Sequence, residues 1–151
     1  MPLADWQFSY QGLVMGDQTN YVTLRLLGLD DLPDIESADL DPVRDGLVRG
    51  TDYARGRIIV AELKLIGSSA VAFKTLVADL RAATAHRADD EPAFNFKDSE
   101  LEERIVYCRP RRRSLPKDFK YMAARTGIAT IEWHATDYRI FSATEISSVL
   151  V

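Results

Sequence analysis

The sequence predicts a single mostly β or α+β domain in which one helix covers a sheet. The chain has 151 residues, of which 46% are hydrophobic and 28% are charged, and this is enough for one hydrophobic core. Segments with the alternation of β-strands stand before and after one amphipathic helical segment. That order favours a helix packed on a sheet. Because we find no internal repeat and no second domain, we assign residues 1–151 to one domain.

The first 29 residues predict two strands. Trp6, Phe8 and Tyr10 alternate with polar residues, which is the period of a half-buried strand. Residues 16–20 have the composition of a turn, and residues 21–29 predict a second strand. An antiparallel hairpin of these two strands is the simplest interpretation.

Residues 30–56 predict a long acidic loop or arm. Pro33 and Pro42 interrupt the segment, and it sustains no apolar period. A loop of this length in a compact domain is typically functional or partly disordered. The acidic residues are Asp30, Asp31, Asp34, Glu36, Asp39, Asp41, Asp45 and Asp52.

Asp39, Asp41 and Asp45 resemble part of a calcium-binding loop, but the match is incomplete. An EF-hand needs oxygen ligands at its first, third and fifth positions and a glycine at the sixth. Counted from Asp39, the fifth position is Val43 and the sixth is Arg44. We therefore predict a solvated acidic loop without a metal ion.

Residues 57–66 predict the clearest strand, and residues 69–87 the only long helix. One face of the strand carries Ile59, Ala61, Leu63 and Leu65 and no charge. The helix begins after Gly67, where Ser68 or Ser69 would cap it. Its apolar stripe, which we expect to pack on the core, consists of Phe73, Leu76, Val77, Leu80 and Ala83.

The last third predicts further strands around a basic run. Residues 104–108 are β-rich, and residues 121–141 contain an alternating segment. Between them lies the basic run of Arg109, Arg111, Arg112 and Arg113. Three interpretations remain open: a solvated hairpin tip paired with nearby acids, a docking surface for an acidic subunit, and a nucleic-acid contact. No aromatic residue lies between Arg109 and Lys117, which weighs against stacking on single strands.

The sequence predicts neither a catalytic site nor a cofactor or metal site. Cys108 is the only cysteine, so no intrachain disulfide is possible, and a lone cysteine in an apolar strand is typically a small core residue. His86 and His134 alone make a poor zinc site. The net charge of −4 argues against general nucleic-acid binding, and no apolar run is long enough to cross a bilayer. The N-terminus has no secretory signal, so we expect synthesis in the cytoplasm.

The order of several short segments resembles the N-terminal hub domain of siphophage distal tail proteins, which are minor tail proteins. The segments are Gly12-Leu-Val-Met-Gly16, Gly28-Leu-Asp-Asp-Leu-Pro33, Asp45-Gly46 with Gly50, Arg57-Ile-Ile-Val before the strand–helix pair, the arginine–proline run, and Ala135-Thr-Asp-Tyr-Arg-Ile-Phe-Ser142. The resemblance implies a β-sandwich or barrel flanked by one helix and related to tail tube proteins. In that family a further C-terminal domain often follows.

The resemblance also implies a structural role in the virion and no enzymatic activity. Six copies would form a ring that joins the tail tube to the tip complex and leaves a channel for the genome. The implied partners are other copies of the chain, the tail tube protein, the tail tip protein and the tape measure protein, without a membrane or a cofactor.

We expect the two opposite charge clusters to meet at a subunit or tube interface. The basic residues of this interface would be Arg109, Arg111, Arg112 and Arg113, and the acidic ones Asp39, Asp41 and Asp45. Two alternatives belong to other functional classes. One is a small ligand-binding or enzyme domain with a pocket under residues 30–56, and the other is a nucleic-acid-binding module built on a basic hairpin.

Overall fold

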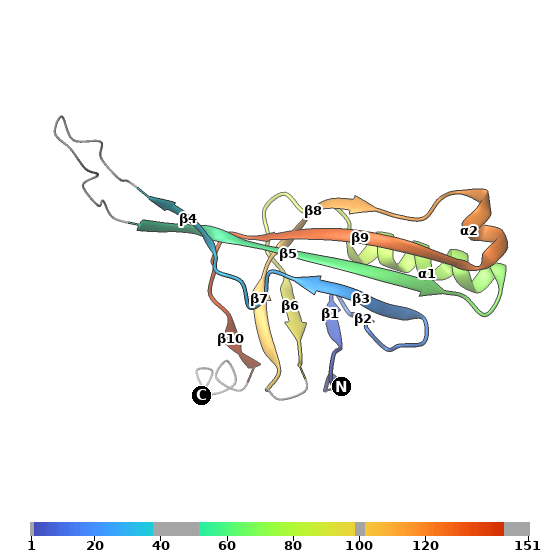
Figure 1. The fold of residues 1–151 in the computed structure, drawn as a ribbon, viewed down its shortest axis with the longest axis horizontal. Coiled ribbons are helices and arrows are strands. Elements are labelled where there is room, and N and C mark those ends of the chain that lie inside the picture. The colour runs from blue at the N-terminus through green and yellow to red at the C-terminus, as the bar shows by residue number, and fades with distance from the viewer. Residues whose placement is uncertain (1, 38–51, 99–101, 144–151) are drawn as a thin grey trace, which may run out of the picture.

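The computed structural model describes residues 2–37, 52–98 and 102–143, which form two antiparallel sheets and two helices (Figure 1). The small sheet has the order β10-β7-β6-β1-β2, and these strands span Phe141–Ser142, Arg104–Tyr107, Ala93–Phe96, Phe8–Tyr10 and Leu13–Met15. The large sheet has the order β3-β5-β9-β8, and these strands span Tyr21–Leu27, Asp52–Ile66, Thr126–Ala135 and Arg109–Ser114. In addition, β4 (Asp34–Ser37) pairs with the start of β5. The helices are α1 (Ala70–Ala83) and α2 (Phe119–Ala124).

The two sheets meet in an aromatic cluster around Trp133 of β9. Its ring centroid lies 5.2 Å from that of Phe94, 5.8 Å from that of Tyr10 and 6.4 Å from that of Phe8, all three on the small sheet. Edge-to-face pairs of this kind add to the free energy of burying the rings. Both sheets remain open within the described residues, so the sandwich, and not the closed barrel, describes the fold.

The predicted strand at residues 57–66 is confirmed as the second part of β5. Ile59, Ala61, Leu63 and Leu65 are all completely buried, whereas Ile58 on the other face is exposed. The strand lies between β3 and β9 and pairs with both along this stretch. A central strand with one charge-free face explains why the prediction succeeded here.

Helix α1 begins where the sequence predicts and ends earlier than expected. Ser69 is the N-cap, and its hydroxyl accepts a hydrogen bond from the Ala72 backbone N–H at 3.0 Å. Phe73, Val77 and Leu80 are buried in the core. The expected end at Arg87 is wrong. The helix stops at Ala83, and Thr84 follows as its C-cap.

The predicted hairpin between residues 6–10 and 21–29 is wrong. β1 pairs with β2 and β6 in the small sheet, whereas β3 pairs with β5 in the large one. Gln11 and Gly12, both with positive φ, close the turn between Tyr10 and Leu13. Two successive positive φ angles are what a tight hairpin turn requires, so the chain reverses before the turn that we predicted.

The predicted loop at residues 30–56 is partly wrong, because its two ends form a ribbon. β4 pairs with residues 52–56 of β5, with a register shift between Asp34 and Ile35. The ribbon extends β5 beyond the rest of the large sheet and projects from one end of the molecule (Figure 1). No sheet or helix among the described residues covers either face of this ribbon. Its sequence therefore needs no alternation of apolar and polar residues, and it shows none.

The basic run is a strand, not a solvated hairpin tip. It forms β8, which pairs with β9 at the edge of the large sheet. Pro110 is buried, and the register shifts between Pro110 and Arg112. Proline lacks a backbone N–H and is tolerated at sheet edges and bulges. The next segment, α2, was also missed, because its six residues are too short to show an amphipathic period.

Candidate subunit interface

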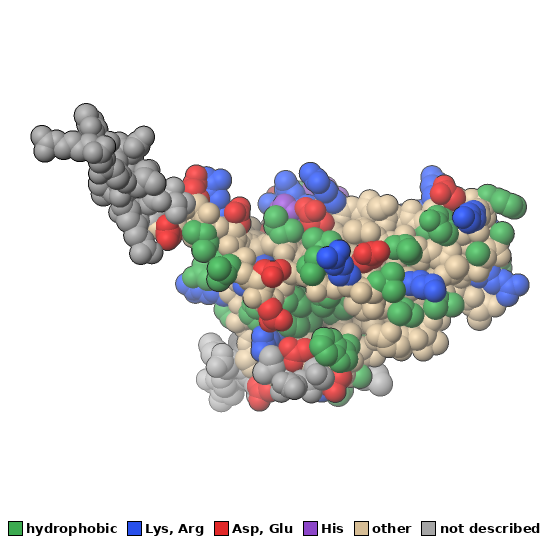
Figure 2. Space-filling model, viewed as in Figure 1, with side chains coloured by type: hydrophobic (Ala, Val, Ile, Leu, Met, Phe, Trp, Pro, Cys, Tyr) green, Lys and Arg blue, Asp and Glu red, His purple; other side chains and the backbone are tan. Residues whose placement is uncertain are grey.

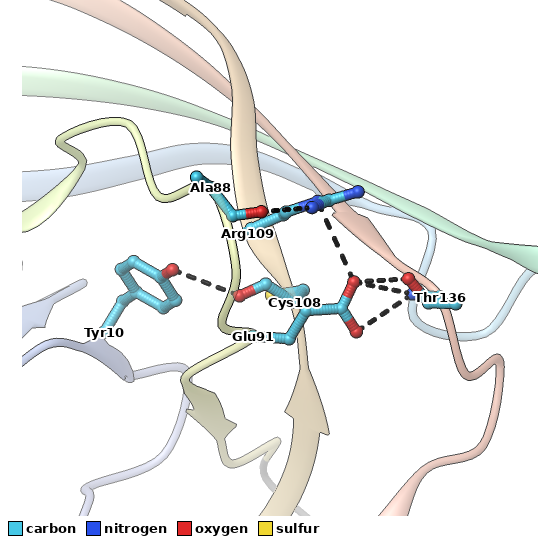
Figure 3. A network of polar contacts seen from close by, with 6 residues as sticks. All are labelled: Tyr10, Ala88, Glu91, Cys108, Arg109 and Thr136. Carbon is cyan, nitrogen blue, oxygen red and sulfur yellow. Dashed lines mark hydrogen bonds and ion pairs between the residues drawn. The ribbon is translucent and has the colours of Figure 1, made fainter.

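The four arginines of β8 have different environments, and Arg109 belongs to an internal network (Figure 3). Its Nη1 donates to the Ala88 carbonyl at 3.0 Å, and its Nε lies 3.9 Å from Glu91 Oε1, which is an ion pair and not a hydrogen bond. The Glu91 carboxylate also accepts from the backbone N–H and the hydroxyl of Thr136. Glu91 therefore fastens the segment before β6 to the ends of β8 and β9.

Arg113 also makes contacts within the fold, because its guanidinium caps the C-terminus of α1. Its Nη1 donates to the carbonyl of Arg81 at 2.8 Å and to that of Thr84 at 3.0 Å. These carbonyls belong to the last turn of the helix, where the backbone lacks partners and the helix dipole favours a positive charge.

Arg111 and Arg112 remain available for contacts with another molecule. Both are exposed, and neither has a hydrogen bond or an ion pair with any described residue. Arg112 lies opposite Glu132 in the ladder, but the Glu132 carboxylate is 2.6 Å from His134 Nε2. β8 is also an edge strand, so none of the described strands pairs with its outer backbone groups.

The ribbon of β4 and the start of β5, which we call the arm, exposes apolar and charged side chains together. Leu32, just before it, is 83% exposed and Tyr53 is 58% exposed. Glu36 and Arg55 form a salt bridge across the two strands. Acidic side chains gather where the arm leaves the body (Figure 2). The other three predicted interface residues, Asp39, Asp41 and Asp45, lie outside the described residues.

Arg57 holds the root of the arm. Its buried guanidinium donates from Nη1 to the carbonyls of Gly28, Leu29 and Asp31 at 2.6, 2.9 and 2.8 Å. Its Nε donates to the Tyr138 carbonyl at 3.1 Å. These bonds join the turn before the arm to β5 and to the segment after β9. Gly28 has a φ of +90°, and a Cβ there would lie 1.8 Å from the Ile58 carbonyl oxygen.

Sequence reasoning missed the role of Arg57, although one signal was present. We assigned Arg57 to the start of a strand and to a segment of the family resemblance, without a contact of its own. A charged residue that enters a strand directly after Gly56 and before three apolar residues is a candidate for a buried contact. Its partners are backbone carbonyls from distant segments, and a sequence pattern does not identify these.

A cleft of about 490 Å³ lies beside β3, the other edge of the large sheet. Trp6, Leu24 and Leu27 contribute apolar surface, and Asp30 and Asp31 lie at one end. The hydroxyl of Thr23, which also lines the cleft, is buried without a hydrogen-bond partner among the described residues. The cleft lies next to the start of the predicted acidic loop, where the ligand-binding alternative expects a pocket.

The one cysteine of the chain lies in the core. Cys108 is buried, and this burial raises the pKa of its thiol well above the usual range. The described residues include no group of three or more His, Cys, Asp or Glu side chains placed to hold a metal ion. Neither described helix has the length and apolar character of a membrane-spanning segment.

Comparison with solved structures identifies a protein with this fold. The Dit protein (gp 19.1) of phage SPP1, described as a paradigm of the hub adsorption apparatus in phages that infect Gram-positive hosts, superposes with a TM-score of 0.70 at 15% sequence identity. The match covers 92% of this chain and 53% of that one, so the chain spans about half the length of the Dit protein. No protein-family model and no curated protein sequence matches. The likeness confirms both the resemblance to distal tail proteins and the β-rich α+β fold predicted from the sequence.

Proposed function

We propose that this protein is a structural component of a phage tail tip. Six copies form a ring that joins the tail tube to the host-attachment complex, and the genome passes through the channel of the ring. Its partners are further copies of the chain, the tail tube protein, the tail tip protein and the tape measure protein, and its location is the virion.

The observation that carries this proposal is the fold likeness to a hub protein over nearly the whole chain. Two further features support it. The arm projects from the body with exposed apolar side chains, which favours contact with another subunit. In the part of the chain that the structure describes, the sheet edges at β3 and β8 are open, and open edges are suited to association.

Of the four arginines predicted at an interface, two remain candidates for a direct contact with another subunit. Arg111 and Arg112 would contact the adjacent subunit or the tail tube, because their charges have no described partner. Arg109 and Arg113 would support this surface from within, since both are bonded to other parts of the fold. The contribution of Asp39, Asp41 and Asp45 to the interface stays a proposal.

Charge reversal at Arg111 and Arg112 tests this interface. The Arg111→Glu/Arg112→Glu variant should stay folded and assemble about tenfold more weakly, because two favourable charge contacts become repulsive. The matched control is Arg111→Lys/Arg112→Lys, which keeps both charges and should assemble normally. Sedimentation at low and high salt is the measurement. Normal assembly of the glutamate variant at both salt concentrations would refute this charge docking.

A second candidate function is the binding of a small ligand in the cleft beside β3. The volume of about 490 Å³ favours it, since ligand pockets occupy about 300–1,000 Å³. A protein that remains monomeric but takes up a ligand that changes the fluorescence of Trp6 would favour this function over the structural one.

A further inference from the structure

The cleft beside β3 contains an exposed tryptophan on a rigid turn. Trp6 lines the cleft, and its side chain is 63% exposed. The Trp6 backbone N–H donates to the Lys97 carbonyl at 2.9 Å, and a Cβ at Gly16 would lie 2.5 Å from the Trp6 carbonyl oxygen. The backbone of Trp6 is therefore closely packed, while its indole keeps open surface that a ligand can contact.

Two residues of the cleft have a backbone conformation that is unfavourable for a side chain. Trp6 has a φ of +63° and Gln18 has a φ of +60°, and they are two of the four non-glycine residues with positive φ in the described chain. The carboxylate of Asp17 fixes the turn that carries Gln18, because it accepts from the backbone N–H groups of residues 19–21, each at 2.9 Å. Strained residues held by their surroundings are concentrated at binding sites.

Several polar groups of the cleft make no contact within the fold. The Thr23 hydroxyl is buried and has no hydrogen-bond partner among the described residues. The side chains of Gln18, Arg25 and Asp30 also line the cleft, and none of them has a hydrogen bond or an ion pair with a described residue. Because a buried polar group without a partner is costly, a ligand that bonds to Thr23 would gain affinity from it.

These groups together indicate the chemical class of the ligand. A wholly apolar ligand would leave the Thr23 hydroxyl and the charged groups of the cleft without partners. A ligand with a net charge would meet charges of both signs, because Arg25 and Asp30 both line the cleft. A sugar ring avoids both penalties. Its C–H face packs on an indole, and its hydroxyl groups donate to amide and carboxylate oxygens and accept from a guanidinium.

We propose that the cleft beside β3 binds a neutral saccharide. One sugar ring stacks on the indole of Trp6, and its hydroxyl groups bond to Thr23, Gln18 and Asp30. The inference names a ligand class for the second candidate function, and it does not depend on the ring of six copies.

Calorimetry of the full chain with a neutral oligosaccharide tests this binding. An array of immobilised neutral oligosaccharides identifies the sugar, and isothermal titration with the same free sugar measures the dissociation constant. Trp6→Ala should weaken binding by about tenfold or more, because the stacking surface is lost, and Trp6→Phe should recover part of the affinity. Thr23→Val keeps the shape of the side chain but removes the hydroxyl, so it should weaken binding by about threefold to tenfold.

The matched control is Phe119→Ala, which removes an exposed aromatic side chain that does not line the cleft. This variant should bind the sugar as the parent does. The fluorescence of Trp133, which is completely buried, shows whether Trp6→Ala stays folded. Equal affinities of the parent and a folded Trp6→Ala variant would overturn the inference, and so would the absence of binding to every neutral oligosaccharide on the array.

The same samples separate this inference from the role in the tail. Closed rings that bind no neutral saccharide would overturn the saccharide site and leave the proposed ring intact. A protein that binds the sugar but stays monomeric at every concentration would support the site and contradict the ring.

Discussion

Arg57 shows how one side chain connects three distant segments. Its four hydrogen bonds reach the turn after β3 and the segment after β9, and every acceptor is a backbone carbonyl. Buried carbonyls that lose their donor are costly, because water does not replace it. The position of the arm therefore depends on a residue in the interior of the fold.

Replacement of Arg57 by Gln should lower the free energy of unfolding by about 2–4 kcal/mol, since several carbonyls lose their donor at once. The control is Arg55→Gln, whose exposed salt bridge with Glu36 should contribute less than about 1 kcal/mol. Urea denaturation measures both variants. Equal effects of the two substitutions would show that Arg57 does not hold the root of the arm.

Buried groups that ionise only when the chain unfolds should make the protein less stable in alkali. Burial raises the pKa of the Cys108 thiol, and it also raises the pKa of the Tyr10 and Tyr21 hydroxyls. The unfolded chain loses these protons first, at about pH 8.5 for cysteine and about pH 10 for tyrosine. The contribution to stability is therefore complete below these values and falls as the pH rises above them.

The unfolding free energy should decrease above about pH 8.5, by up to about 1.4 kcal/mol per pH unit for each group. In Cys108→Ala the decrease should begin only near pH 10, where the tyrosines ionise. Urea unfolding between pH 7 and pH 11 compares the two proteins. The same onset in both would contradict the assignment of the first step to Cys108.

At the scale of elements, a side chain from strand β8 stabilises the C-terminus of helix α1. Arg113 of β8 donates to the last carbonyls of the helix, so helix and strand stabilise each other. We predict that Arg113→Ala lowers the free energy of unfolding by about 1 kcal/mol. Arg111→Ala on the same strand should change it by less than about 0.5 kcal/mol. Thermal or urea unfolding of the two variants shows whether Arg113 stabilises the C-terminus of α1.

The elements that the sequence predicted correctly are those that pack one face on the core and leave the other exposed. β5 and α1 each bury one regular stripe, so their periods appear in the sequence. The arm could not be predicted, because it is a ribbon exposed on both faces. The pairing of β1 with β2 depended on the backbone conformation of Gln11 and Gly12, which the hydrophobic pattern does not show.

The interface role of the arginine run stays a prediction, and the different environments of its four arginines could not be predicted for a similar reason. The sequence located the arginine run, but its separation into internal and available residues depends on tertiary contacts. Arg109 reaches Ala88 and Glu91, and Arg113 reaches α1, from positions distant in the chain. The charges in the sequence do not distinguish the internal arginines from the available ones.

At the scale of the whole molecule, the opposite ends of the domain differ in charge and shape. The arm leaves one end of the long axis and α2 lies at the other (Figure 1), and two unlike ends favour heterologous contacts between identical copies. Such contacts include exposed charges, so the assembly should weaken as the salt concentration increases.

The mass of the assembled protein tests the central claim most directly. Native mass spectrometry of the purified chain, together with electron microscopy of the same sample, gives the number of copies and their arrangement. We predict a closed ring of six copies of the 17.0 kDa chain with an open central channel. A monomer at every concentration, or an open filament without closed rings, would contradict the proposed role as a tail hub.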